Sequence, residues 1–210
     1  MAERSVFLGC EISLEKAFRP RIETEFWAQK AVKENRLRKG RTDILDIFAG
    51  SGCIGMSFLK GIEGSFVDFV DISPDAVSEI KKNLEANDIP EERYKIIRSD
   101  FFSNIGEKKY DIILSNPPYV ALDRIKEVEE DVLKRDPKEA LFGGKDGMDC
   151  IRRFLGEVKD HLKKEGVFYM EFDPLQEKEI KKELEILGID CDIRKDQFGK
   201  IRWLKGRRSK

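Results

Sequence analysis

The stretch Ile44-Leu45-Asp46-Ile47-Phe48-Ala49-Gly50-Ser51-Gly52-Cys53-Ile54-Gly55 decides the fold of this chain. Its first five residues are mostly apolar, which predicts a buried strand. Gly50, Gly52 and Gly55 then form a GxGxxG pattern, in which a ligand can approach bare backbone at the start of a helix. A strand, a glycine turn and a helix in this order predict the first unit of a parallel α/β sheet.

Further apolar runs continue the predicted sheet. Strands are expected at 66–71, 94–99, 110–115 and 167–172, separated by stretches with helical spacing. The run 66–71 is apolar on both pleat faces, as in a strand that helices cover on both sides. Segments 192–194 and 201–204, joined through Gln197-Phe198-Gly199, predict an antiparallel hairpin at the end of the chain.

Three helices are expected from capping residues and apolar spacing. Ser73 is expected to cap the first, with Pro74 at its first position. A third helix is expected over 175–187, before Gly188. The buried stripes are predicted to be Val77, Ile80 and Leu84 in the first helix, and Met148, Ile151, Leu155, Val158 and Leu162 in the second. The stretch 121–147 has no clear core pattern, and a loop of that length is usually functional.

Length and charge limit the classes of protein to which the chain could belong. Its 210 residues suit one large α/β domain better than two. Charged residues make up 39%, but 40 Lys and Arg nearly balance 41 Asp and Glu, giving a net charge of −1. Such a balance gives no general attraction to nucleic acid or to an anionic membrane. Without an apolar run long enough to span a bilayer, and without a secretory start, we expect a soluble, cytoplasmic protein.

Cysteine and histidine exclude several kinds of metal site and catalytic site. The four cysteines are far apart and form no Cys-x-x-Cys pair, so neither a zinc ribbon nor a disulfide framework is expected. His161 is the only histidine, which excludes sites with two histidine ligands. We expect His161 to be solvated near a helix end, where it complements the helix dipole. No bound metal is expected.

The glycine loop and the next two strand ends predict a nucleoside site. Asp71 lies at the end of the second strand, 21 residues after Gly50, where a carboxylate accepts hydrogen bonds from a ribose diol. A dinucleotide would place its pyrophosphate on the glycine loop, whereas S-adenosylmethionine has no phosphate and needs partners for its amino-acid end. Asp46, at the loop entrance, could serve the ammonium group of S-adenosylmethionine, directly or through water. After the third strand, Asp100 offers a carboxylate to the adenine amine. Either Phe101 or Phe102 offers a ring to its face, and the other is expected in the core.

The loop Asn116-Pro117-Pro118-Tyr119 follows the fourth strand at the same sheet edge. Ligands of open α/β sheets bind at the carboxyl ends of strands. The Asn116 side-chain oxygen and the Pro117 carbonyl suit the two N–H groups of a planar nitrogen, and Tyr119 could stack on the flat group. We therefore predict methyl transfer to an amide or an aromatic amine, a reaction that needs no histidine base.

These residues resemble one known family, the release factor glutamine methyltransferases (the HemK/PrmC family). Asn116-Pro117-Pro118-Tyr119 is shared with amino-methyltransferases that act on DNA and RNA. More specific are the similarities of 19–25, Arg-Pro-Arg-Ile-Glu-Thr-Glu, and of 139–148, Glu-Ala-Leu-Phe-Gly-Gly-Lys-Asp-Gly-Met. Glu171, Gln176 and the segment 198–202 also match. The resemblance covers nearly the whole chain from about Arg19.

The resemblance implies a class I S-adenosylmethionine-dependent methyltransferase, Rossmann-like, with a seven-stranded sheet. The expected domain boundaries are 1–40 for an N-terminal segment with a lead-in helix and 41–210 for the methyltransferase domain. The donor would be S-adenosyl-L-methionine, the product S-adenosyl-L-homocysteine, and the acceptor the glutamine of a Gly-Gly-Gln loop in a peptide chain release factor. Asn116, Pro117, Pro118 and Tyr119 would hold the amide. The expected cofactor-binding residues are Asp46, Phe48, Ala49, Gly50, Ser51, Gly52, Asp71, Ile72, Asp100, Phe101 and Asn116.

The chain departs from the family at three places. Phe48-Ala49 stands where Gly-Thr is usual and looks more like ribosomal-RNA guanine methyltransferases, and Asp173 replaces a usual glycine. The resemblance is to the family's catalytic domain without its helical N-terminal domain, since about twenty residues precede Pro20.

Three other functions stay open. The nearest alternative is a methyltransferase acting on an exocyclic amine of adenine or guanine in rRNA or DNA; its support is the basic stretch 200–210, although such runs are commonly solvated tails. A nicotinamide dehydrogenase and a non-catalytic scaffold are more remote.

Overall fold

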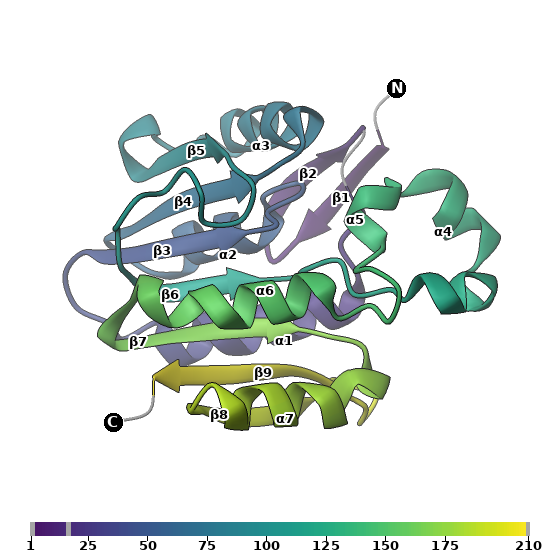
Figure 1. The fold of residues 1–210 in the computed structure, drawn as a ribbon. Helices are drawn as coiled ribbons and strands as arrows, with labels where there is room; N and C mark the ends of the chain where they lie inside the picture. The colour runs from purple at the N-terminus through teal and green to yellow at the C-terminus, as the bar shows by residue number, and fades with distance from the viewer. Residues whose placement is uncertain (1–2, 16–17, 209–210) are drawn as a thin grey trace.

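The structure is a computed structural model that describes residues 3–15 and 18–208, and its centre is a seven-stranded sheet (Figure 1). The strands lie in the order β5-β4-β3-β6-β7-β9-β8. Those that run parallel are β3 (Thr42–Ile47), β4 (Ser65–Asp71), β5 (Tyr94–Arg98), β6 (Tyr110–Ser115) and β7 (Leu162–Glu171). β8 (Ile189–Lys195) and β9 (Ile201–Arg208) form an antiparallel hairpin, and β9 pairs with β7. The predicted sheet and C-terminal hairpin are therefore confirmed.

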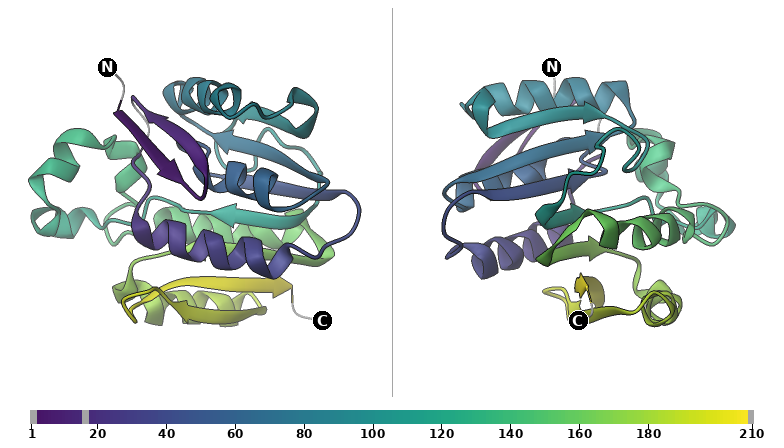
Figure 2. Two further views of the ribbon diagram at one scale, coloured as in Figure 1. Left: turned by 180° about the vertical axis from the view of Figure 1, so that it is seen from behind. Right: turned by 60° about the vertical axis from the view of Figure 1, so that its left-hand side comes forward.

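Helices cover both faces of this sheet because its central strands are apolar on both sides. On one face α1 (Ile22–Asn35), α2 (Cys53–Gly61) and α3 (Pro74–Ala86) contribute to a core with Ile44, Ile112 and Leu114. On the other, α6 (Asp149–Val158) and α7 (Glu177–Ile186) pack with Leu45 and Ile113. Figure 2 shows α1 and α2 on the side opposite α6. Burial on both faces means that a ligand reaches the central strands at their ends.

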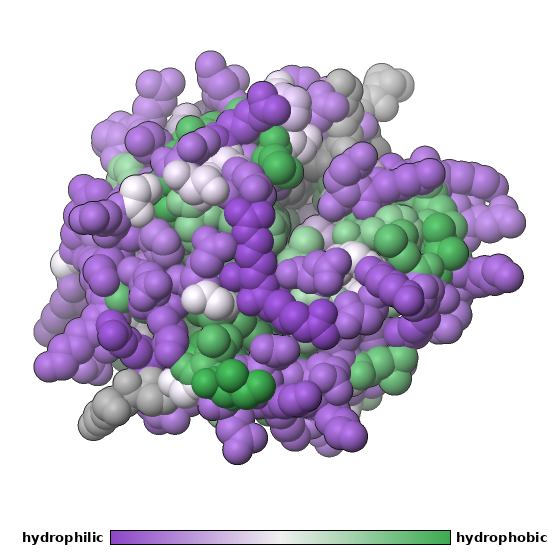
Figure 3. Space-filling model, viewed as in Figure 1, coloured by the Kyte–Doolittle hydropathy of each residue, from purple (hydrophilic) through white to green (hydrophobic). Residues whose placement is uncertain are grey.

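A segment of short helices projects from the sheet between β6 and α6 (Figure 1). It contains η2 (Leu122–Glu127), α4 (Glu130–Arg135) and α5 (Lys138–Leu141), and we call it the helical insertion. Its surface carries apolar side chains among charged ones in Figure 3, and Leu122 and Ile125 are exposed. The remaining short helices are η1 (Glu91–Arg93), η3 (Lys159–His161) and η4 (Pro174–Gln176). The insertion occupies most of the stretch that lacks a core pattern in the sequence.

An N-terminal β-hairpin lies beside α3 and was not predicted. Strands β1 (Glu3–Phe7) and β2 (Cys10–Leu14) are joined by Leu8 and Gly9, with φ of 46° and 79°. Two successive residues with positive φ are typical of the tight turns that connect hairpin strands. The Asn83 side chain of α3 accepts from Ser13 N at 2.8 Å and donates to Ser13 O at 3.2 Å. This side chain thereby satisfies backbone groups on the outer edge of β2.

The buried stripes of two helices differ from prediction. Val77 is only half-buried, because the inward face of α3 is formed instead by Ala76, Ile80 and Leu84. The predicted second helix is α6, which ends at Val158; Leu162, predicted to belong to it, is buried as the first residue of β7. Leu162 lies four positions after Val158, so its spacing fits a helix although it belongs to a strand.

His161 is not the solvated residue that the sequence predicts. It is half-buried, and its ring stacks on Phe102 with centroids 4.4 Å apart and planes 7° from parallel. Its Nδ1 lies 3.2 Å from the backbone oxygen of Lys108. The prediction failed because α6 ends earlier than expected, so His161 lies in the short turn η3 against the core. Over residues 3–15 and 18–208, no helix combines the length and the apolar character needed to cross a bilayer.

Candidate active site

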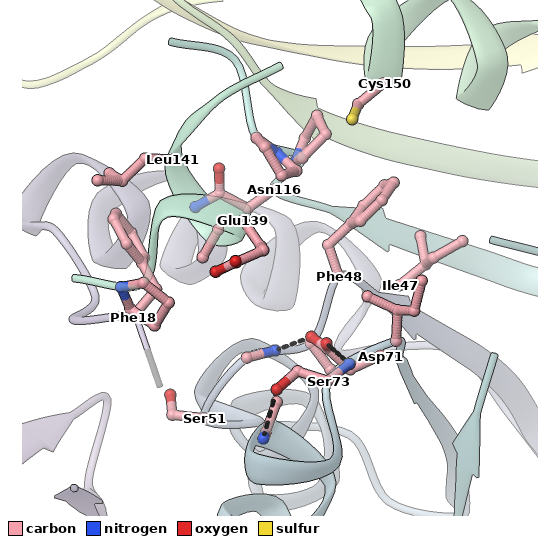
Figure 4. A pocket seen from close by; sticks show the side chains of 18 of the residues that line it. Phe18, Ile47, Phe48, Ser51, Asp71, Ser73, Asn116, Glu139, Leu141 and Cys150 are labelled. Atoms are coloured by element: carbon pink, nitrogen blue, oxygen red, sulfur yellow. Dashed lines mark hydrogen bonds between the residues drawn. The ribbon is translucent and has the colours of Figure 1, made fainter. Parts of the chain in front are cut away.

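A cavity of about 750 Å³ opens at the carboxyl ends of β3, β4, β5 and β6 (Figure 4). The structure thus brings together loops that are far apart in the sequence, such as those that contain Gly50 and Asn116. In Figure 4, Asp71 lies on one side of the cavity and Asn116 on the other. Of the predicted site residues, those that line the cavity are Phe48, Ala49, Gly50, Ser51, Asp71, Ile72, Asp100, Phe101, Asn116, Pro117, Pro118 and Tyr119.

Asp71 is held in place by backbone donors at the end of β4. Its Oδ2 accepts from Gly50 N and its Oδ1 from Ser73 N, each at 2.9 Å, as the dashed lines in Figure 4 show. Burial raises the pKa of the Asp71 carboxyl, and these backbone N–H groups oppose the rise. Each carboxylate oxygen accepts more than one hydrogen bond, so both can still accept from a ligand. Asp71 therefore presents a preoriented acceptor pair to the cavity.

Asp46 and Gly52, two of the predicted cofactor residues, do not line the cavity. Asp46 is fully buried, and its Oδ2 accepts from Gly55 N at 2.8 Å near the start of α2. Burial raises the pKa of Asp46 to about 8. Gly52 is the N-cap of α2 with φ of 78°, a conformation that favours glycine. Their contribution to binding stays a prediction, and from these positions it would act through the loop that they shape.

The two adjacent phenylalanines after β5 have different environments. Phe102 is buried in the core, whereas Phe101 lines the cavity and meets Phe48 edge-on at 4.9 Å. Both Phe48 and Phe101 have positive φ, of 61° and 49°. Such backbone strain in residues other than glycine is concentrated at functional sites. The positive φ values of Phe48, after β3, and Phe101, after β5, are consistent with backbones that direct both rings toward one ligand.

Asp100 is paired with a cation that the sequence did not identify. Arg153 of α6 places Nη1 2.9 Å from both carboxylate oxygens of Asp100. The same guanidinium lies over the Phe101 ring, 3.9 Å from its centroid. A role for Asp100 toward an adenine amine therefore stays a prediction. In that role the Asp100 carboxylate would accept from the adenine amine and from Arg153 at the same time.

The loop from Asn116 to Tyr119 is braced by the segment 141–147. Val120 N donates to Leu141 O at 2.9 Å, and Gly143 N donates to Val120 O at 3.0 Å. The approach is so close that a Cβ on Gly143 would lie 2.3 Å from Pro118 O, and one on Gly147 2.3 Å from Tyr119 O. These glycines therefore let two stretches of backbone lie side by side, which explains the Gly-Gly-x-Asp-Gly spacing.

Glu171, at the end of β7, and Gln176, in η4, both hold Tyr119 in place. Gln176 Nε2 donates to Tyr119 O at 3.0 Å and to Gly147 O at 2.9 Å. The Tyr119 hydroxyl donates to Glu171 Oε1 at 2.9 Å. Burial raises the pKa of the Tyr119 hydroxyl well above its usual range, with the Glu171 charge adding to the effect. Tyr119 is thus neutral and fixed at both its backbone and its hydroxyl end.

Several lining residues were missed because they come from outside the parallel βα units. Arg21, before α1, donates through Nη2 to the buried Asp136 of the helical insertion at 2.8 Å. Glu139 points into the cavity in Figure 4. The long patternless stretch was the available signal for the insertion, but it does not say which residues face inward. The missed residues include Phe18, Pro20, Arg21, Thr24, Val128, Val132, Pro137, Glu139 and Leu141.

Comparisons with known proteins agree with this geometry. The family profile described as "Methyltransferase small domain" matches residues 28–145. The chain is 34% identical over 200 residues to a release factor glutamine methyltransferase of Clostridium acetobutylicum, covering 93% of this chain and 70% of the relative. The chain belongs to the release factor glutamine methyltransferase family. It is a methyltransferase with the class I fold.

Two further similarities show the breadth of that fold and family. The methyltransferase is 32% identical over 163 residues to a ribosomal protein uL3 glutamine methyltransferase of Bradyrhizobium diazoefficiens, covering 77% of this chain and 50% of the relative. Its fold is similar to that of a T. thermophilus 16S rRNA N2 G1207 methyltransferase in complex with AdoMet and guanosine, with a TM-score of 0.68 and 20% identity. That match covers 100% of this chain and 50% of the other. Across the described ranges of the methyltransferase, no group of three or more His, Cys, Asp or Glu side chains could hold a metal ion.

Proposed function

We propose that this methyltransferase transfers a methyl group from S-adenosyl-L-methionine to the side-chain amide nitrogen of a protein glutamine. The observation that carries the proposal is the meeting of two loops in one cavity. Gly50 and Asp71 line it at one side, and Asn116 to Tyr119 line it at the other. Relatives with more than 30% identity are named as glutamine methyltransferases, which supports the amide as the acceptor.

The residues at the β3, β4 and β5 ends fit S-adenosylmethionine. A cavity of about 750 Å³ lies in the range of small-molecule sites, roughly 300–1,000 Å³. Asp71 would accept from the ribose hydroxyls, Phe101 would contact the adenine, and the backbone from Phe48 to Ser51 would contact the remainder. When bound, the cofactor supplies an electrophilic methyl group on a sulfonium, and it leaves as S-adenosyl-L-homocysteine.

The loop from Asn116 to Tyr119, which we call the acceptor loop, would compensate for the weak nucleophilicity of an amide nitrogen. The amide lone pair is delocalised, so reaction requires orientation and stabilisation of the positive charge that develops on nitrogen. The Asn116 side-chain oxygen and the Pro117 carbonyl would accept the two amide N–H bonds and aim the nitrogen at the methyl group. As the new N–C bond forms, the nitrogen becomes acidic and gives up one proton to solvent.

We propose that the acceptor is the glutamine of a Gly-Gly-Gln loop in a peptide chain release factor. The match to a relative named for release factors covers 93% of this chain, whereas the match to one named for ribosomal protein uL3 covers 77%. The test is to incubate the methyltransferase with radiolabelled S-adenosylmethionine and release factor, uL3 or rRNA separately. We expect label in the release factor, with mass spectrometry placing one methyl group on the Gly-Gly-Gln glutamine.

Label in uL3 alone would support the proposed glutamine methylation but would show that the acceptor protein is uL3 and not a release factor. Label in rRNA alone would replace the proposal with the nucleic-acid alternative.

The basic C-terminal residues give that alternative little support. Lys205 pairs with Glu34 at 2.9 Å, Arg202 lies 3.5 Å from Asp196, and Arg207 lies 3.8 Å from Asp190. Lys210, the last of the basic residues, lies outside the described part of the chain.

A further inference from the structure

Glu171 is a buried carboxylate on which three side-chain donors converge behind the acceptor loop. The Thr24 hydroxyl and the Trp27 indole N–H donate to Oε2, each at 2.7 Å, and the Tyr119 hydroxyl donates to Oε1 at 2.9 Å. The exposed fraction of Glu171 is 1%. An ionised carboxylate only accepts hydrogen bonds, so three donors suit the charged form. Burial raises the pKa of Glu171, while these donors and the Arg202 charge lower it.

Thr24 links Glu171 to Asn116 through hydrogen bonds. A threonine hydroxyl has one proton and two acceptor lone pairs. Because that proton is donated to Glu171, Thr24 Oγ1 can only accept from its other neighbour, the Asn116 side-chain amide. Asn116 Nδ2 lies 3.5 Å from Thr24 Oγ1. The NH₂ group of the amide therefore faces Thr24, and Oδ1 takes the other side.

We propose that Glu171 and Thr24 are positioning residues that fix the Asn116 amide with its oxygen toward the acceptor nitrogen. The inference rests on the proposed function, in which that nitrogen presents N–H bonds and needs an oxygen opposite. A reversed Asn116 amide would direct its own N–H groups at those bonds and repel the acceptor. The two orientations have nearly the same shape, so packing alone selects between them weakly. The direction of the Thr24 hydroxyl supplies the selection.

Thr24→Val tests this inference because it removes the hydroxyl with little change of shape, whereas Thr24→Ser keeps it. We expect Thr24→Val to lower kcat with the glutamine acceptor by on the order of 100-fold, as misorientation of a reacting group does. We expect Thr24→Ser to restore most of it, and the Kd for S-adenosylhomocysteine to stay unchanged in both. The matched control is Trp27→Phe, which removes another donor to Glu171 Oε2 that has no hydrogen bond to Asn116.

Trp27→Phe is expected to lower the melting temperature while keeping most of kcat. A loss of kcat in Trp27→Phe as large as that in Thr24→Val, measured well below both melting temperatures, would overturn the inference, because any damage to the Glu171 cluster would then suffice. So would an unchanged kcat in Thr24→Val.

A second measurement does not depend on the acceptor. The side-chain amide of Asn116 gives a ¹⁵N NMR signal, which can be assigned by its absence in Asn116→Ala. We expect its protons to exchange slowly in the wild type and in Thr24→Ser, and rapidly in Thr24→Val. Equal exchange in all three overturns the inference. If Thr24→Val alone exchanges fast but no glutamine is methylated by the wild type, the hydrogen-bond relay is supported and the proposed function fails.

Discussion

The two halves of the cavity are built in different ways. The donor half consists of the loops that directly follow β3, β4 and β5, and its key hydrogen bond joins Gly50 to Asp71, 21 residues apart. In the acceptor half, the loop after β6 is held by Gln176, 57 residues beyond Tyr119, and by Thr24, 92 residues before Asn116. Under the proposed function, donor recognition would therefore be a local property of consecutive βα units, while acceptor recognition would depend on distant segments.

This difference means that the two halves should respond separately to substitution. Changes in the donor half should alter affinity for the cofactor, because its residues are the ones proposed to contact the ribose and the adenine. Changes in the acceptor half should alter turnover and the geometry of the loop, because several segments jointly hold it.

Asn116→Ala should have the largest effect on activity. Removing the side-chain oxygen takes away a group aimed at the acceptor nitrogen, and loss of one such preorganised group lowers kcat by roughly 10²–10³-fold. Within residues 3–15 and 18–208, the Asn116 side chain hydrogen-bonds to Thr24 and not to the donor loops. We therefore expect the Kd for S-adenosylhomocysteine to stay within the wild-type range, although Asn116 is also among the cofactor-binding residues expected from the sequence. Steady-state kinetics with the release factor and calorimetry with S-adenosylhomocysteine give the two quantities. A parallel loss of cofactor affinity would contradict the separation of the halves.

Asp71→Ala should show the reverse pattern. It removes the proposed ribose acceptor and also leaves Gly50 N and Ser73 N without their partner. Hydrogen bonds to charged groups contribute about 1.5–3 kcal/mol, so the Kd for S-adenosylhomocysteine should rise roughly 10- to 100-fold. At saturating donor, kcat should recover most of its wild-type value. A kcat that stays low at every donor concentration would mean that Asp71 acts in the chemical step.

Gly147→Ala tests the close approach that braces the acceptor loop. The added Cβ would lie 2.3 Å from Tyr119 O, at a residue with φ of 78°. We expect a loss of about 1–3 kcal/mol in the free energy of unfolding, and a higher KM for the protein acceptor. Gly156→Ala is the matched control, because nothing lies within 4 Å of its added Cβ in the last turn of α6. That control should stabilise slightly, by about 0.5–1 kcal/mol. Chemical denaturation measures both, and an equal response of the two variants would remove the bracing role.

The donor half was predictable because its signals are local. The spacing from the glycine loop to Asp71 needs only two consecutive strands, and the structure places both at one cavity. The split between Phe101 and Phe102 was foreseen as one ring in the site and one in the core. The residues alone left open which ring was which, because adjacent side chains after a strand can turn either way. The family resemblance named Phe101, and the structure places Phe101 at the cavity and Phe102 in the core.

The acceptor half was predictable only in its central tetrapeptide. The family segments around Thr24, Gly147 and Gln176 matched known positions, but nothing in their spacing says that they contact the loop after β6. The N-terminal hairpin was missed for a related reason. Its strands are short, its turn is Leu8-Gly9, and its partner Asn83 lies on α3, so its stability comes from tertiary contacts.

Arg153→Ala should have the smallest effect, and it asks whether the donor half too depends on a distant residue. Arg153 reaches from α6 to cover the Phe101 ring and to pair with Asp100. A cation over an exposed aromatic ring contributes about 0.5–1 kcal/mol, and exposed ion pairs add little. The Kd for S-adenosylhomocysteine should therefore rise about two- to fivefold, with kcat unchanged. Arg152→Ala is the control, since Arg152, the neighbour of Arg153 on α6, pairs with Asp146 instead. Equal affinities of the two variants would show that Phe101 is held by Phe48 and its own backbone alone, and would make the donor half wholly local.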